Sequence, residues 1–174
     1  ELSFQDKTIL VDIGLPLDCN LSDGYDAHLP QPLFDNIKEG KKQIDAVLLS
    51  QAHLDHYGLA GMLPREITVY CGAASAEIVA LSNLLGRSEN QSFEFQPFQS
   101  QQKFEIGPFA ITPLLMDHSA FDAHGFLIEA GGKSVFYTGD FRGHGRKGKL
   151  LNRLIQNPPK VDVLMMEGTL VGER

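Results

Sequence analysis

The sequence predicts a single α/β domain that contains two groups of strands. The length of 174 residues is enough for one sizeable core and too short for two ordinary domains, so we expect one domain over residues 1–174. In residues 46–85, apolar runs typical of buried strands alternate with a segment of helical periodicity, which is the pattern of an α/β fold. In residues 93–138, short segments alternate apolar with polar residues between turns, which predicts a second, mostly antiparallel group of strands.

The first half of the chain opens with strands over residues 2–4 and 8–14, joined by a turn into a hairpin. A long loop rich in Pro, Gly, Asp and Asn covers residues 15–43, with the hint of a short helix at 33–38. The uninterrupted apolar run 46–49 predicts a buried strand.

A further strand is expected at residues 67–70, and it precedes an amphipathic helix at 73–85 that Gly86 ends. The second half predicts strands over 93–95, 103–106 and 109–115.

A hairpin with a Gly-Gly turn follows over residues 125–130 and 134–138. Helical spacing of leucines at 150–155 then predicts a helix that Pro158 and Pro159 end. The apolar run 161–166 predicts a last buried strand.

Composition narrows the class of protein. The net charge of −7 argues against a broad basic face for nucleic acid, yet it is compatible with a metal site that holds one phosphodiester. No apolar stretch approaches the roughly 18 residues of a membrane span, and the first residues lack the features of a signal peptide. The two cysteines, Cys19 and Cys71, form no metal or disulfide pattern, so we expect a soluble protein of the reducing cytoplasm.

The chemistry is concentrated where the predicted strands end. Directly after the strand 46–49, the segment Ser-Gln-Ala-His-Leu-Asp-His-Tyr-Gly carries His53, Asp55 and His56. A buried carboxylate needs a partner, and Asp55 has no cation nearby in sequence, so a metal ion is the expected partner. Three other predicted strands also end in polar groups, at Asp12, at Asp117-His118 and at Asp140. Strand ends that meet at one edge of a sheet supply the imidazoles and carboxylates that a dinuclear hydrolytic site needs.

These motifs resemble those of the metallo-β-lactamase superfamily. The matching residues are Asp12 in Val-Asp-Ile-Gly, the His53/Asp55/His56 cluster, His118 in Asp-His-Ser and Asp140 in Tyr-Thr-Gly-Asp-Phe-Arg. Glu167-Gly168-Thr169 is similar to the segment before the inserted second domain in the RNA-processing (β-CASP) branch, which includes ribonuclease J and the cleavage-factor nucleases. The resemblance implies an αβ/βα four-layer sandwich, here incomplete at its carboxyl end.

The resemblance also implies roles for these residues. His53 and His118 would hold a first metal ion, Asp55 and His56 a second, and Asp140 would bridge the two. Asp55 would in addition orient the attacking water or accept its proton. Asp12 would support the ligands without touching an ion, and turn capping is its alternative. Zinc is the implied metal, as one or two ions, with manganese as an alternative.

The sequence departs from the family pattern at two points. The family motif reads His-x-His-x-Asp-His, and Gln51 stands where its first histidine is expected. The last histidine of the family follows the inserted domain, and this chain reaches only Arg174. The sequence leaves open whether Gln51 is natural or introduced and whether the chain is a fragment.

A cationic, glycine-rich loop follows Asp140 and contains Arg142, His144, Arg146 and Lys147. It is either a phosphate-contacting loop or a solvated helix start. Glu167 is expected to assist the site or to be a simple loop carboxylate.

The resulting hypothesis is a metal-dependent phosphodiesterase or ribonuclease that acts on RNA and has no membrane partner. Two alternatives stay open: a catalytically impaired relative that binds or assembles, which Gln51 favours, and a thioester or lactone hydrolase with the same fold. Homo-oligomerisation is also left open.

Overall fold

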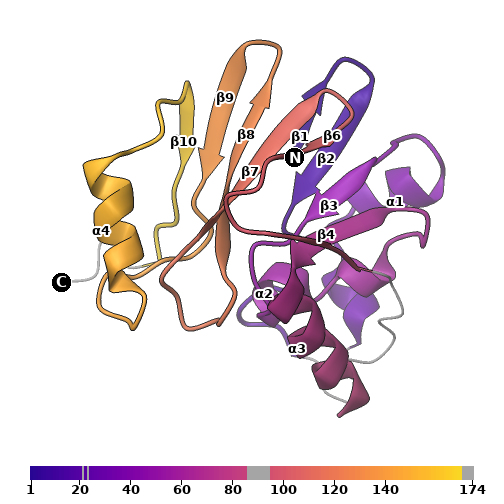
Figure 1. Cartoon of the computed structure of the whole chain (residues 1–174). Coiled ribbons are helices and arrows are strands. Elements are labelled where there is room, and N and C mark those ends of the chain that lie inside the picture. Colours follow the sequence, from indigo (N-terminus) through magenta and orange to yellow (C-terminus); the bar gives the residue numbers. More distant parts are fainter. Residues whose placement is uncertain (21, 23, 86–94, 170–174) are drawn as a thin grey trace.

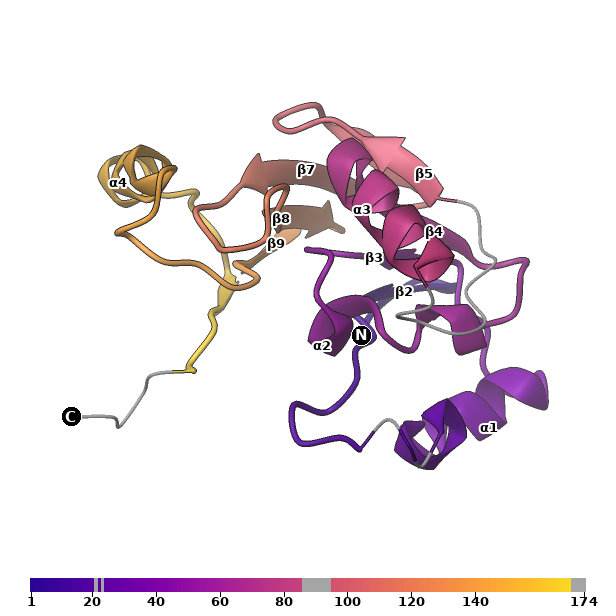
Figure 2. The same cartoon turned by 90° about the horizontal axis from the view of Figure 1, so that it is seen from below.

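The computed structural model describes residues 1–20, 22, 24–85 and 95–169, and in these residues the chain forms two five-stranded sheets (Figure 1). The strand order is β1-β2-β3-β4-β5 in the first sheet and β10-β9-β8-β7-β6 in the second. Helices α1, α2 and α3 gather around the first sheet, whereas α4 lies apart from them beside β10 (Figure 2). The predicted α/β fold with two groups of strands is therefore confirmed.

The first sheet is mostly parallel. Its strands are β1 (Leu2–Phe4), β2 (Lys7–Val11), β3 (Ala46–Leu48), β4 (Thr68–Gly72) and β5 (Phe95–Phe98). β1 and β2 form the expected antiparallel hairpin, and the remaining neighbours pair in parallel. The helical segments of this half are η2 (Tyr25–His28), α1 (Leu33–Lys38), α2 (Leu54–Tyr57), η3 (Ala60–Met62) and α3 (Ala73–Leu84).

The second sheet is antiparallel except at one edge, where β10 pairs in parallel with β9. Its elements are β6 (Phe104–Ile106), β7 (Phe109–Leu115), β8 (His124–Ala130), β9 (Lys133–Tyr137), α4 (Gly148–Gln156) and β10 (Val163–Met165). β7 and β9 both run antiparallel to β8, so their carboxyl ends lie at the same edge of the sheet.

Two expectations about the strands were wrong. β5 was assigned to the antiparallel group, but it pairs in parallel with β4 in the first sheet, since local alternation does not specify a partner. The run 161–166 was expected to be buried, whereas Val163, Leu164 and Met165 are 49%, 55% and 46% exposed at the edge of the second sheet. The expected start of β5 at 93 and the helix stop at Gly86 lie outside the described residues.

The core has two layers, because the central strands are buried on both faces. Between the sheets, Ile9 and Leu48 pack with Phe126 and other apolar residues of the second sheet. On the other face of the first sheet, Val47 packs with the apolar residues of the helices, including Val79. This burial on both faces explains why the 46–49 segment is apolar without interruption. None of the helices in the described ranges combines the length and apolarity needed to cross a membrane.

Substitution of Phe126 is a test of the core layer between the sheets. Its side chain is completely buried, and its ring meets that of Phe98 edge-to-face, with the ring centroids 5.6 Å apart. We predict that Phe126→Ala lowers the free energy of unfolding by about 3–5 kcal/mol in chemical denaturation, the usual cost of emptying such a site. Phe121, which is 71% exposed, is the matched control, and Phe121→Ala should change stability little. Equal effects of the two substitutions would contradict this assignment of the core.

Candidate metal centre

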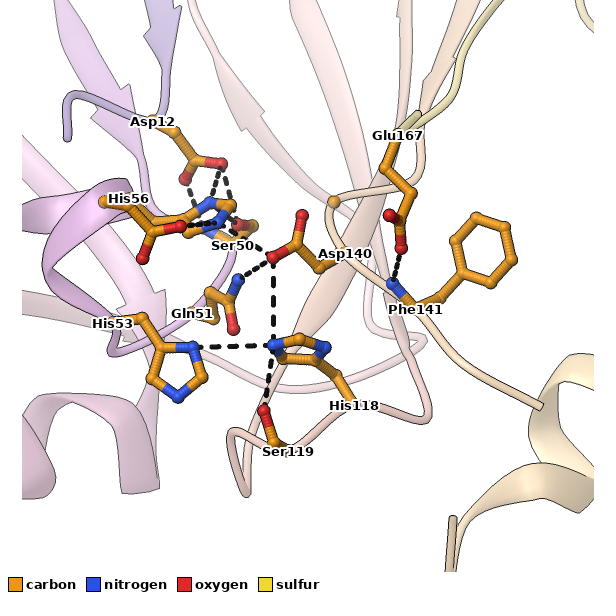
Figure 3. A network of polar contacts seen from close by, with 12 residues as sticks. Asp12, Ser50, Gln51, His53, His56, His118, Ser119, Asp140, Phe141 and Glu167 are labelled. Carbon is orange, nitrogen blue, oxygen red and sulfur yellow. Dashed lines mark hydrogen bonds and ion pairs between the residues drawn. The ribbon is translucent and has the colours of Figure 1, made fainter. Parts of the chain in front are cut away.

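Polar side chains from both sheets meet at one edge, just beyond the ends of β2, β3, β7 and β9 (Figure 3). Asp12 follows β2, and Gln51 and His53 follow β3. His118 and Asp140 come from the second sheet, after β7 and β9. The structure thus brings together the strand-end residues that the sequence singled out, and their role as metal ligands stays a prediction.

Asp12 is the centre of a hydrogen-bond network that joins the two sheets. Its Oδ1 accepts from the backbone N–H of Ser50 at 2.7 Å. Its Oδ2 accepts from the hydroxyls of Ser50 and Tyr137 at 2.7 and 2.6 Å, and from Nδ1 of His56 at 2.8 Å. The backbone of Asp12 has φ of 56°, a left-handed conformation that aspartate tolerates better than most residues. Asp12 therefore fixes the imidazole of His56 with its Nε2 directed towards the site.

The segment after Asp12 holds the short helix α2 in place. The amide of Ile13 donates to the carbonyl of His56 at 2.8 Å, and the amide of Leu15 donates to Leu54 at 2.9 Å. A Cβ atom at Gly14 would overlap the carbonyl oxygen of Asp55, so only glycine permits this close approach. α2 itself was not expected from the sequence, because a helix of one turn has no periodicity to detect.

Asp55, His56 and Asp140 form the part of the site best suited to an ion. One potential ligand atom from each lies within 4.8 Å of the others. Nε2 of His56 is 3.4 Å from Asp55 Oδ2 and 3.1 Å from Asp140 Oδ2. Two ligands of a tetrahedral zinc ion, each at about 2.1 Å, lie about 3.4 Å apart, so this donor set fits an ion.

His53 and His118 form a second part of the site. Nδ1 of His53 lies 3.4 Å from Nε2 of His118, and the two rings meet edge-to-face at 5.3 Å. The same His118 nitrogen is 3.8 Å from Oδ2 of Asp140. Asp140 therefore stands between the two groups, as a bridging carboxylate would.

Gln51 is buried between these groups. Its Nε2 donates to Oδ2 of Asp140 at 2.8 Å, so the amide orients that carboxylate.

The pKa directions in this cluster follow from its geometry. Burial lowers the pKa of His56, but hydrogen bonds to Asp12 and Asp140 outweigh burial and raise it to about 10. The same hydrogen bond from His56 holds the pKa of Asp140 below its usual value. Burial lowers the pKa of His118, which favours the neutral form that can bind a metal ion. In the metal-free protein His56 is thus charged at neutral pH, and binding of an ion to it must release a proton.

The cationic loop after Asp140 is built around a buried carboxylate, that of Asp117. Asp117 accepts from the amides of Gly145 and Lys147 at 2.8 and 3.2 Å and lies 3.8 Å from Nε of Arg142. The ammonium group of Lys147 donates to the carbonyls of Phe121 and Ala120, at 2.7 and 3.3 Å. Lys147 therefore fastens the loop rather than pointing freely to solvent.

His144 and Arg146 of this loop are exposed, and so is Lys149 in the first turn of α4. Glu167 accepts from the amide of Phe141 at 2.7 Å, which secures the backbone next to Asp140.

Sequence reasoning did not assign a positioning role to Ser50, Tyr137 or Asp117, although Asp117 was noted as a polar residue at a strand end. Each of these residues lies directly before a predicted ligand or a few positions before one. Their positioning role depends on hydrogen bonds between segments that are far apart in the chain. The only available signal was a polar residue at the end of an apolar strand, and that signal is not specific.

Comparison with known proteins gives a family match over most of the chain. A family model described as "Beta-lactamase superfamily domain" matches residues 9–174. Cleavage and polyadenylation specificity factor subunit 3 of Dictyostelium discoideum is 27% identical in an alignment of 175 residues. The alignment covers 87% of this chain and 22% of that protein. Ribonuclease J of Sinorhizobium meliloti is 25% identical over 136 residues. This alignment covers 77% of this chain and 24% of ribonuclease J. The chain thus spans about a quarter of the length of these relatives.

Solved structures agree on the fold. A crystal structure of a protein of unknown function from Enterococcus faecalis V583 has a TM-score of 0.79 at 23% identity, covering 96% of this chain and 45% of that one. Zn²⁺-bound PqqB from Methylobacterium extorquens has a TM-score of 0.60 at 19% identity. The superposition covers 97% of this chain and 58% of PqqB. The second of these structures is a zinc-bound protein.

The raised pKa of His56 predicts a pH dependence of stability in chelator-treated protein. Charged His56 stabilises the fold fully below about pH 6.5, its ordinary pKa, and this contribution is lost as the pH rises towards about 10. The free energy of unfolding should therefore fall by up to about 1.4 kcal/mol per pH unit across this window, relative to His56→Gln. Denaturant titrations at several pH values measure the difference, and exposed His144→Gln is the control. A parallel fall in His56→Gln would disprove the assignment.

Proposed function

Because the chain belongs to the metallo-β-lactamase superfamily, and its curated relatives lie in the RNA-processing branch, we propose that it is a metal-dependent phosphodiesterase that cleaves RNA. The observation that carries this proposal is the convergence of Asp55, His56 and Asp140 within 4.8 Å at the carboxyl ends of strands from two sheets. RNA as substrate is supported by the names of the relatives, one of which is a ribonuclease.

The donor set suits an ion of the kind the superfamily uses. Asp55, His56 and Asp140 would hold one ion, and His53 and His118, with Asp140, would hold another. A bound ion would polarise the phosphoryl oxygen and lower the pKa of a bound water to about 7. Zinc is the ion proposed first, because imidazole and carboxylate donors both suit it.

The residues of the chain orient the reacting groups. The Asp12 carboxylate holds Nδ1 of His56 at 2.8 Å, so Nε2 faces the site. The amide of Gln51 holds the Asp140 carboxylate at 2.8 Å. Such supporting hydrogen bonds fix the direction of ligands, and their loss typically reduces metal affinity about 10–100-fold.

Asp55 is the proposed acceptor of the water proton. Its side chain is 31% exposed, in contrast to the buried His56 beside it, so water can reach its carboxylate. A positioned carboxylate that accepts a proton from water is a general base. The proton then has a direct path to solvent.

The loop after Asp140, together with the first turn of α4, is the proposed contact for the RNA backbone. Arg146 and Lys149 are exposed, whereas Lys147 is bonded to carbonyls within the protein. Because the chain has a net charge of −7, Arg146 and Lys149 are proposed as local cationic contacts for phosphate outside the metal centre. Lys147 instead keeps the loop in position.

A second candidate function is a binding module with weakened catalysis. The observation that favours it is the amide of Gln51, which replaces an expected imidazole in contact with Asp140. Such a protein would bind RNA or metal with little turnover. Assays of bis-p-nitrophenyl phosphate, single-stranded RNA and a thioester separate these possibilities, and hydrolysis of the thioester alone would identify a third class of substrate.

We predict that Asp140→Ala removes at least one bound ion and reduces phosphodiester hydrolysis to background, because Asp140 lies in contact with both groups of ligands. Elemental analysis after dialysis and the assays above measure the two effects. Circular dichroism should be unchanged, and exposed Asp18→Ala is the matched control. Full activity in Asp140→Ala would rule out the proposed centre.

We predict that the double substitution Arg146→Ala/Lys149→Ala weakens binding of single-stranded RNA and makes it less dependent on salt. Each lost phosphate contact should reduce the slope of log affinity against log salt by about 0.7. The control is Lys38→Ala/Arg65→Ala, which removes two exposed cations that lie outside the loop and α4. An equal change in slope for the two double variants would assign the effect to net charge alone.

A further inference from the structure

Gln51 has an unusual environment for a buried amide. The residue is 1% exposed, and its Nε2 is occupied by Asp140 at 2.8 Å. Its Oε1 is buried and accepts no hydrogen bond from the described part of the chain. In the close view, this oxygen points towards the gap between His53 and His118 (Figure 3).

The direction of the amide is fixed by its neighbour. Exchange of the nitrogen and the oxygen would set the oxygen against the Asp140 carboxylate, where two acceptors repel each other. The oxygen must therefore face the histidine pair. A buried acceptor without a partner costs about 1–3 kcal/mol, and this oxygen has none among the described residues, so it is suited to accept from a donor or to bind a cation.

The histidine pair has the spacing of two ligands that share one ion. His53 Nδ1 and His118 Nε2 are 3.4 Å apart. Two nitrogens bound to a tetrahedral ion at about 2.1 Å are separated by about 3.4 Å. The amide oxygen and the two ring nitrogens thus face a common space.

We propose that Gln51 is itself a metal ligand through Oε1, in a site completed by His53 and His118, and that this amide oxygen shifts the metal preference towards Mn²⁺. The inference rests on the proposed function and specifies the ion. Carbonyl-type oxygens suit harder ions such as Mn²⁺, whereas imidazole suits Zn²⁺. Replacement of one imidazole by an amide leaves the charge of the donor set unchanged, so the preference changes through ligand hardness alone.

The test measures metal binding directly on chelator-treated protein. Mn²⁺ affinity is obtained from the electron paramagnetic resonance signal of free Mn²⁺, and Zn²⁺ affinity from competition with a chelator of known strength. We expect Gln51→His to raise the affinity for Zn²⁺ relative to Mn²⁺ by at least about tenfold. Gln51→Met keeps the side-chain length but removes both the amide oxygen and the N–H that bonds to Asp140, so it should weaken Mn²⁺ binding by about 10–100-fold, and the metal preference of Gln51→His separates the two contributions. Exposed Gln102→Ala is the control and should match the parent protein.

The outcomes separate this inference from the proposed function. An unchanged Mn²⁺-to-Zn²⁺ preference in Gln51→His, in a parent protein that binds metal and cleaves RNA, overturns the role of Gln51 alone. A parent protein that binds neither ion overturns both proposals. Thermal unfolding verifies that each variant is folded, and should Gln51→Met fail to fold, the preference of Gln51→His decides.

Discussion

The hydrogen bonds to the Asp12 carboxylate are the interaction on which the site depends. They join the end of β2 to the loop after β3, to α2 and, through Tyr137, to β9 of the second sheet. Hydrogen bonds to a charged acceptor contribute about 1.5–3 kcal/mol each, and here several share one carboxylate that is only 11% exposed. Asp12, which would not touch an ion, thus helps to set the relative position of the two halves of the candidate metal centre, together with the contacts that Gln51 and His56 make to Asp140.

Other carboxylates repeat this arrangement around the site. Glu167 holds the amide next to Asp140, and Asp117 holds two amides of the cationic loop. Asp122 accepts from the first amides of α3 in the same way. Part of the acidic excess of the sequence is therefore used inside the protein to orient backbone segments. Carboxylates that are bonded to backbone amides in this way are not free to face a ligand. A chain with a net charge of −7 is therefore compatible with a site proposed for a polyanion.

The sequence predicted the strands well where burial on both faces leaves an unbroken apolar run, as in β3, and where one buried face gives alternating burial, as in β7. The sequence-based prediction failed where the pairing or burial of a strand depends on neighbouring strands that are distant in the chain. The pairing of β5 and the exposure of β10 depend on which strand lies alongside, and the residues of the strand itself carry no such information. For the site, residue types predicted the convergence of Asp12, His118 and Asp140. The anchoring role of Asp117 was hidden because it adjoins a histidine with a more obvious chemistry.

In the role proposed for Gln51, one substitution would preserve the support of a site while changing what it binds. An imidazole and an amide both offer a donor nitrogen and a separate acceptor atom on a planar group. The Nε2 of Gln51 donates to the Asp140 carboxylate. Its Oε1 faces the pair of imidazoles, His53 and His118. The orientation of Asp140 therefore survives the exchange, since it requires only an N–H group at the right place. The atom presented to an ion is different, because a nitrogen has become a harder oxygen. In the proposed site, position 51 would thus alter metal preference without disturbing the hydrogen-bond network centred on Asp12.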